Sequence, residues 1–195
     1  ILRVPVIQLK DNEGSLQASG EWDRNKAKST LSLISSLNPT PFLHALAPNS
    51  TEIQKLVFSE SPRLDAEIEL QFAREKPEFH VTGSFAAPAL LYDNVAFSDV
   101  GCSFAWKDGH FYARDILVKT QRGALEGNLW IAKDDLRISL HNTIPPTDLS
   151  PLVGPKAREI INSTQFTDTP DIFVTLQSTN LDFANMHGKG HLKLG

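Results

Sequence analysis

The chain has 195 residues, of which 41% are hydrophobic and 22% are charged, and its formal net charge is −4. This length and composition allow a sizeable core. The acidic balance argues against a nucleic-acid partner, which would require a basic stripe on the protein. No run of 18 apolar residues is present, so the sequence predicts no membrane-spanning helix.

Apolar and polar residues alternate along most of the chain. Leu64, Ala66, Ile68, Leu70 and Phe72, for example, alternate with Asp65, Glu67, Glu69 and Gln71. A period of two is typical of strands with one apolar and one solvated face, and short turns between such strands indicate an antiparallel meander. Strands are expected at residues 2–9, 14–22, 28–36, 64–73, 78–85, 90–98, 101–106, 110–119, 123–131, 135–143, 171–178 and 187–194.

Two proline-bounded segments interrupt the alternation. Thr40 and Pro41 can begin a helix that ends before Pro48, and Ser50 or Thr51 can cap a second one. Their counterparts are expected from Thr147 to Val153 and from Lys156 to Asn162. The predicted fold is therefore mainly β, a repetitive antiparallel meander curled into a sheet or trough, with short helical corners near residues 41–57 and 148–162.

The sequence also repeats itself, at an offset of 107 to 109 residues. The segment from Gly14 to Trp22 returns from Gly123 to Trp130, and Phe58-Ser-Glu-Ser-Pro62 returns as Phe166-Thr-Asp-Thr-Pro170. A period of this length indicates one supersecondary unit placed beside the next. We therefore divide the chain into a first unit, residues 1–110, and a second, truncated unit, residues 111–195, and interpret it as a piece of a longer repetitive protein.

No catalytic or metal-binding pattern stands out. His187 and His191 would lie on one face of a strand but about 13 Å apart, too far for one metal ion. The acidic row Asp65, Glu67, Glu69 has the spacing of an inverting glycosidase pair, about 6.5–7 Å, yet a regular strand face favours a solvated surface. The single cysteine, Cys102, is expected to be a small buried hydrophobe. The sequence predicts a protein that is not an enzyme and holds neither metal nor cofactor.

The segment from Asp108 to Leu129 combines a turn glycine, alternating apolar residues and a closing Gly-x-Leu-x-Gly motif. Residues 9–20 repeat its second half, and residues 94–100 fit the strand that precedes it. This pattern resembles the recurring hairpin of the AsmA-like family, which includes the TamB-type proteins. The resemblance implies a periplasmic envelope protein, anchored in the inner membrane by an N-terminal helix, whose curled β-sheet forms an apolar trough that moves phospholipids towards the outer membrane.

The predicted working surface is the apolar face of the sheet. It comprises Leu16, Ala18, Trp22, Leu64, Ala66, Ile68, Leu70, Phe72, Leu125, Leu129 and Ile131, with Leu136, Ile138 and Leu140 adjoining. We expect these side chains to share one concave face that packs against a core or against phospholipid acyl chains. The other expected partner is the remainder of the full-length protein, and any membrane anchor lies in segments outside this sequence.

Two other functions fit the same pattern. An extracellular carbohydrate-binding or adhesive domain would present Trp22, Trp106 and Trp130 as an exposed platform on the polar face. A purely structural spacer would close every apolar face. Tryptophans that line an apolar concavity would favour lipid, whereas tryptophans on the solvated face would favour sugar.

Overall fold

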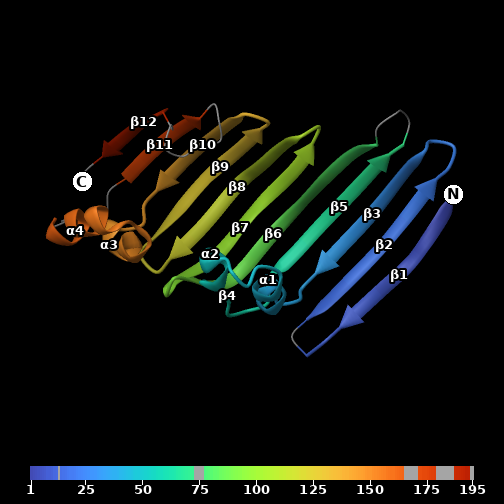
Figure 1. Ribbon diagram of the computed structural model, residues 1–195, viewed down its shortest axis with the longest axis horizontal. Helices are drawn as coiled ribbons and strands as arrows, with labels where there is room; N and C mark the ends of the chain where they lie inside the picture. Colours follow the sequence, from blue (N-terminus) through green and yellow to red (C-terminus); the bar gives the residue numbers. More distant parts are fainter. Residues whose placement is uncertain (13, 73–76, 165–170, 179–186, 194–195) are drawn as a thin grey trace.

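The chain forms one large antiparallel sheet (Figure 1). The structure is a computed structural model that describes residues 1–12, 14–72, 77–164, 171–178 and 187–193. In these residues twelve strands form an open sheet in the order β1-β2-β3-β5-β6-β7-β8-β9-β10-β11-β12, and β4 pairs with β6. The predicted class, a mainly antiparallel β meander with short helices, is confirmed.

The strands are β1 (Leu2–Lys10), β2 (Ser15–Asp23), β3 (Lys28–Ser35), β4 (Leu56–Phe58), β5 (Arg63–Gln71), β6 (Glu78–Tyr92), β7 (Val95–Lys107), β8 (His110–Thr120), β9 (Gly123–Ala132), β10 (Asp135–Asn142), β11 (Asp171–Ser178) and β12 (His187–Lys193). The helices are α1 (Thr40–Leu46), α2 (Thr51–Gln54), α3 (Pro146–Leu149), the 3-10 helix η1 (Ser150–Leu152) and α4 (Pro155–Ser163).

The three strands predicted at 78–85, 90–98 and 101–106 are wrong, because this region contains two long strands, β6 and β7. They meet at a tight turn in which Asp93 and Asn94 both have positive φ angles, of 50° and 66°, which suit a two-residue hairpin. Pro88 lies inside β6, at the point where β5 stops pairing after Ala86 and β4 starts at Leu90. A proline, which lacks an N–H group, is tolerated at such a gap in the ladder.

The end of the first helical corner also differs from the prediction. The helix expected to continue to residue 57 ends at Gln54, and Leu56–Phe58 forms the short strand β4 against β6. Ser50 caps α2 as predicted, because its side chain accepts a hydrogen bond from the Ile53 N–H at 3.4 Å. The side chain of Thr40 instead accepts a hydrogen bond from the Phe58 N–H at 3.0 Å, which ties α1 to β4.

Both helical corners leave the sheet through the same hydrogen-bonded arrangement. In the first, the Ser15 N–H donates to Ser36 Oγ at 3.0 Å and the Ser36 N–H donates to the Ser15 carbonyl at 2.7 Å. In the second, the Ala124 N–H donates to Thr143 Oγ1 at 3.0 Å and the Thr143 N–H to the Ala124 carbonyl at 2.8 Å. The two exits agree with the sequence repeat. The division into units 1–110 and 111–195 stays an interpretation, since the sheet continues from β7 to β8 across residue 110.

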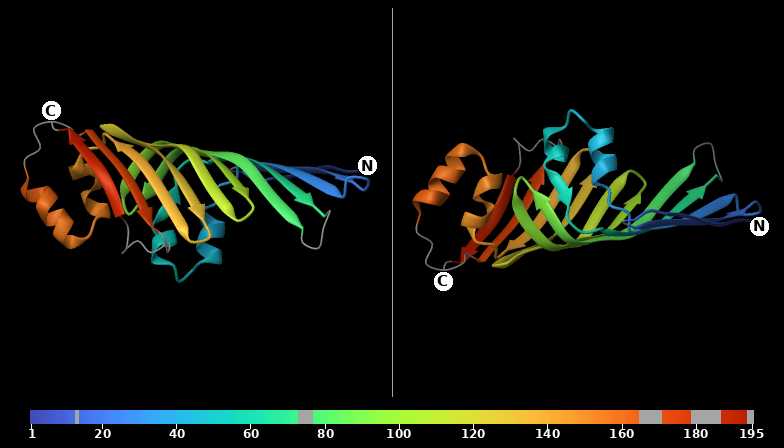
Figure 2. Two further views of the ribbon diagram at one scale, coloured as in Figure 1. Left: turned by 90° about the horizontal axis from the view of Figure 1, so that it is seen from above. Right: turned by 90° about the horizontal axis from the view of Figure 1, so that it is seen from below.

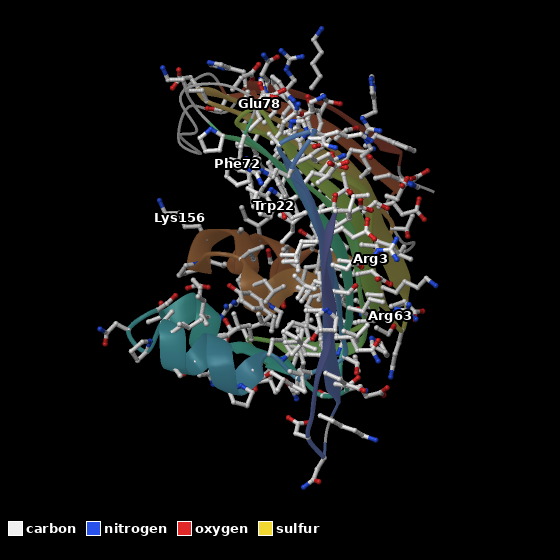
Figure 3. The ribbon with its side chains drawn as sticks, turned by 90° about the vertical axis from the view of Figure 1, so that its right-hand side faces the viewer. Arg3, Trp22, Arg63, Phe72, Glu78 and Lys156 are labelled. Atoms are coloured by element: carbon white, nitrogen blue, oxygen red, sulfur yellow. The ribbon has the colours of Figure 1, made fainter. Side chains whose placement is uncertain are left out.

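The pairing register gives the sheet one apolar face. Directly paired residues share a face, and one row of direct partners crosses nine strands from β2 to β11. Its members are all apolar: Ala18, Leu33, Ala66, Gly83, Phe104, Ala113, Leu129, Ile138 and Leu176. The sheet curves, and the helical corners lie on its concave side together with Trp22 and Phe72, whereas Arg3 and Arg63 lie on the opposite side (Figures 2 and 3). We call these two sides the concave face and the convex face.

Glycines on the concave face allow neighbouring strands to approach closely. A Cβ atom added at Gly83 would lie 2.3 Å from the Asp65 carbonyl oxygen and 2.6 Å from the ring of Phe104. At Gly127 it would lie 2.4 Å from the Ser139 carbonyl oxygen. Glycines at such positions permit the local bending that curls a sheet.

We predict that Gly83→Ala destabilises the protein by about 1–3 kcal/mol, because the added methyl group must displace backbone or a packed ring. Urea unfolding followed by circular dichroism measures the change. Gly190→Ala is the matched control, since its Cβ atom would meet no atom closer than 3.3 Å, and its effect should stay within about 0.5 kcal/mol. Equal effects of the two substitutions would contradict this account of the curvature.

Candidate functional site

The predicted working surface lies together on the concave face. The pairing register places the predicted strand residues on this face. It connects Leu16 and Ala18 of β2, through β5, with β9 and β10. Phe72 follows the end of β5, its N–H donates to the Ala27 carbonyl at 2.7 Å, and its ring lies beside Trp22 (Figure 3). The residues so placed are Leu16, Ala18, Trp22, Leu64, Ala66, Ile68, Leu70, Phe72, Leu125, Leu129, Ile131, Leu136, Ile138 and Leu140.

Charged side chains are absent from the two longest rows of this face in the described strands. Beside the row from Ala18 to Leu176 runs a second row of direct partners, again nine strands wide. It consists of Gly20, Leu31, Ile68, Val81, Trp106, Phe111, Ile131, Leu136 and Ser178. The concave face therefore carries an uninterrupted apolar strip across most of the sheet.

Most of this apolar strip remains in contact with solvent. Among the described residues, the apolar side chains that are buried are Phe58, Ala87, Val95, Ala113, Leu136 and Ile144. The chain exposes 13265 Å², whereas about 9,200 Å² is expected of a compact protein of its mass. Within the described residues, the sizeable core that the composition allows is not formed, because their sheet is a single layer that the helices cover only in part.

The helical corners close one end of the concave face. The ring of Phe58, next to the first corner, packs edge-on against Phe85 with the ring centroids 6.0 Å apart. Ile144, which begins the second corner, is 1% exposed. The guanidinium group of Arg122 holds this second corner in place through Asp148 and through the Thr147 hydroxyl, at 3.0 Å.

The opposite end, which we call the open rim, carries large exposed aromatic rings. Trp22, Phe72, Phe79 and Trp106 are 44%, 52%, 44% and 43% exposed. Trp22, Phe72 and Leu70 also line a shallow depression of ≈ 400 Å³, together with Arg24, Ala27 and Ser29. The rim therefore presents large aromatic rings to solvent.

The convex face, in contrast, carries charged pairs. Arg63 pairs with Asp65 at 2.9 Å, and Lys28 pairs with Glu69 at 2.5 Å. The hydrogen bond from the Lys28 ammonium group lowers the pKa of Glu69 below its ordinary value. Asp65 and Glu69 of the acidic row are thus held in ion pairs on a strand face that contacts solvent.

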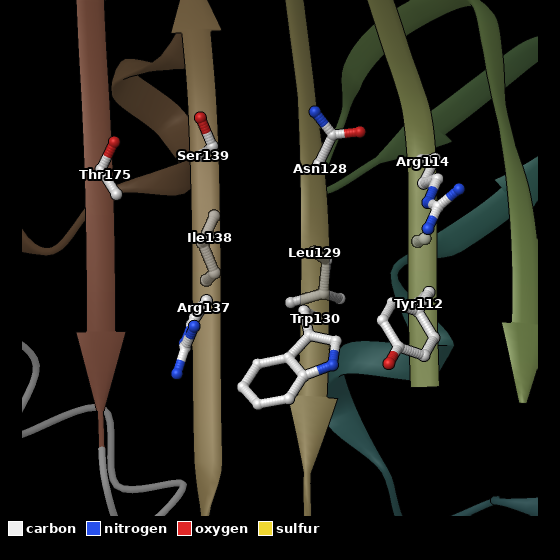
Figure 4. Close-up of a pocket in the computed structure, with 10 residues that line it drawn as sticks. Tyr112, Arg114, Asn128, Leu129, Trp130, Arg137, Ile138, Ser139 and Thr175 are labelled. Atoms are coloured by element: carbon white, nitrogen blue, oxygen red, sulfur yellow. The ribbon is translucent and has the colours of Figure 1, made fainter. Parts of the chain in front are cut away.

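The three tryptophans are divided between the faces. Trp22 and Trp106 belong to the concave face, whereas Trp130 lies on the convex face, beside Tyr112 and Arg137 in a second depression of ≈ 400 Å³ (Figure 4). Strand parity contains this information, because Trp130 is one residue from both Leu129 and Ile131. A platform made of all three tryptophans is therefore inconsistent with the alternation along β9.

Little else in the described residues suggests chemistry. Burial raises the pKa of the Cys102 thiol, which disfavours the nucleophilic thiolate. No three His, Cys, Asp or Glu side chains among the described residues gather as metal ligands. In the same part of the chain, no helix is both long and apolar enough to cross a bilayer.

Comparison of the chain with protein families, with curated proteins and with solved structures finds no match. The likeness to the AsmA-like family therefore rests on the hairpin pattern in the sequence.

Proposed function

We propose that this chain is a non-enzymatic β module of a larger cell-envelope protein, and that its concave face holds lipid acyl chains during lipid transfer or outer-membrane biogenesis. The observation that carries the proposal is the strip of uncharged side chains, nine strands wide, that the described residues cover with no second layer. Exposed apolar surface of this extent is typical of a binding surface. The AsmA-like hairpin pattern adds the expectation of a periplasmic location and an inner-membrane anchor elsewhere in the protein.

The dimensions of the strip suit acyl chains. Nine neighbouring strands are separated by eight spacings of about 4.8 Å, which gives a width of roughly 38 Å. An acyl chain fills one leaflet, or about half of a 30 Å hydrocarbon core. The strip can therefore hold acyl chains in succession, as a conduit requires, and each methylene group that it buries gains about 0.8 kcal/mol.

The two alternative functions agree less well with the geometry. A structural spacer should leave little apolar surface open, yet the aromatic rings of the open rim are about half exposed. A sugar platform built from all three tryptophans requires them on one face, and Trp130 lies on the face opposite to Trp22 and Trp106. Lipid remains the partner that fits the concave face best.

Tryptophan quenching tests where lipid lies. In Trp130→Phe, the remaining indoles of Trp22 and Trp106 report on the concave face, and in Trp22→Phe/Trp106→Phe the remaining Trp130 reports on the convex face. We expect phospholipids with brominated acyl chains to quench the first variant and leave the second nearly unchanged, because bromine quenches on contact. Equal quenching of both variants, or quenching of neither, would contradict the proposal.

A second test compares neighbouring residues of β5. Ile68→Asp should destabilise the protein by about 2–3 kcal/mol and reduce the lipid that co-purifies with it, because it places a carboxylate between Leu31 and Val81. The control is Glu67→Lys. Glu67 lies between Ser32 and Thr82 on the convex face, so this substitution should change the free energy of unfolding by less than about 0.5 kcal/mol.

Native mass spectrometry measures the bound lipid, and chemical denaturation measures stability. The milder Leu70→Ala separates the loss of lipid from the loss of folding, since it only shortens a partly exposed side chain. If a folded Glu67→Lys protein lost its lipid while Leu70→Ala kept it, the working surface would be the convex face and the lipid proposal would fail.

A further inference from the structure

The convex face of β8, β9 and β10 carries a row of rings that the proposed lipid strip does not use. Trp130 is directly paired with Tyr112 on β8 and with Arg137 on β10. The Tyr112 ring centroid lies 6.4 Å from that of Trp130, and the Arg137 guanidinium carbon lies 4.5 Å from the indole centroid. The indole lies along the sheet with its face turned outward (Figure 4). Contacts from both neighbouring strands therefore hold a flat ring ready for stacking.

A second row, one step along the same strands, carries neutral hydrogen-bonding groups. Asn128, Ser139 and Thr175 are direct partners on β9, β10 and β11, and all three are exposed. Asn128 Oδ1 accepts a hydrogen bond from the Asp115 N–H at 3.3 Å. Its amide N–H groups have no partner among the described residues. The two rows line the same depression of ≈ 400 Å³.

Two cations, Arg114 and Lys189, lie near the two ends of this polar row, and neither forms an ion pair within the described part of the chain. Arg114 lines the depression, and its guanidinium carbon lies 5.8 Å from the Tyr112 ring centroid. Lys189 is the direct partner of Thr175 at the other end of the row. Neither has a carboxylate of the described residues within ion-pair distance, whereas Arg137 is paired with Asp135 at 2.8 Å. The depression thus offers one flat ring, several hydrogen-bonding groups and the guanidinium group of Arg114. Lys189 lies outside its lining, next to Thr175.

We infer that this depression binds an acidic oligosaccharide. The apolar C–H face of a pyranose ring would stack on Trp130, its hydroxyl groups would bond to Asn128 and its neighbours in the polar row, and a uronate carboxylate would pair with Arg114. The inference is independent of the lipid proposal, because it uses the opposite face of the sheet.

A single-stranded nucleic acid would also combine stacking with positive charge, but the face disagrees with it. A nucleic acid stacks its successive bases on several rings, whereas the depression presents the single outward-facing indole of Trp130. A nucleic-acid surface would require a continuous basic groove. One lining cation, Arg114, next to a row of neutral hydrogen-bonding groups favours the saccharide.

The experiment uses Trp22→Phe/Trp106→Phe, in which Trp130 is the remaining indole and reports on the depression directly. Polygalacturonate should shift or quench its fluorescence saturably, and neutral dextran should not. Arg114→Gln, introduced into the same background, should weaken polygalacturonate binding roughly tenfold, since it removes one charge-assisted pair. Lys107→Gln is the matched control: it removes one exposed positive charge from the same face outside the depression, and affinity should hardly change.

Circular dichroism of each variant confirms that it is folded before binding is compared. The inference is overturned if polygalacturonate gives no saturable change, or if dextran binds equally well. It is also overturned if Arg114→Gln and Lys107→Gln weaken binding to the same degree, which would indicate a diffuse charge effect. Saturable binding of polyuridylate in place of polygalacturonate would assign the face to nucleic acid.

Discussion

The structure depends on one constraint. Alternation along each strand gives the sheet two chemically different faces, and the described residues form only one layer. Most domains bury the apolar face of a sheet against a second layer. In this chain the helical corners cover only one end of that face, around Phe58 and Ile144. The register is nevertheless strongly specified, because a slip of one residue in β5 would exchange Ile68 and Leu70 for Glu67 and Glu69. The same alternation that fixes the register therefore leaves an apolar strip in contact with solvent.

The shape of this surface follows from residues that carry no functional group. Gly83 and Gly127 let the strands approach each other on the concave face, where any side chain would meet backbone oxygen atoms. β-Bulges also bend the strands. One lies at Asp115, which has a φ of 52°, and there the pairing of β8 with β9 shifts between Ala113 and Ile116. Both helical corners are excursions between strands that are neighbours in the sheet, β3 and β5 in one case and β10 and β11 in the other. They cap the face without interrupting the ladder.

Much of this architecture could be predicted from alternation alone, because the period of two is a local property of the chain. The face shared by Leu16, Ile68 and Leu129 was predictable for that reason. The course of β6 and β7 was not predictable from alternation. Pro88 is tolerated inside β6 because the pairing with β5 ends and the pairing with β4 begins on either side of it, and this depends on tertiary structure. The extent to which the concave face is covered depends on the presence of a second layer, and local sequence patterns do not predict such a layer. The convex depression was missed for a different reason: three tryptophans were grouped by type, although parity separates Trp130 from the other two.

The two faces should differ in the thermodynamics of what they bind. A ligand on the concave face removes apolar surface from water, and the marker of such burial is a negative heat-capacity change. A ligand on the convex face exchanges hydrogen bonds with water around Asn128 and Ser139, which gives a favourable enthalpy and a smaller heat-capacity change. Either ligand stabilises the fold through linkage, by about 2.7 kcal/mol at a free concentration one hundred times Kd. A single-layer sheet has few buried side chains to hold it together, so the ligand that we propose for the concave strip would add to the stability of the fold through this linkage.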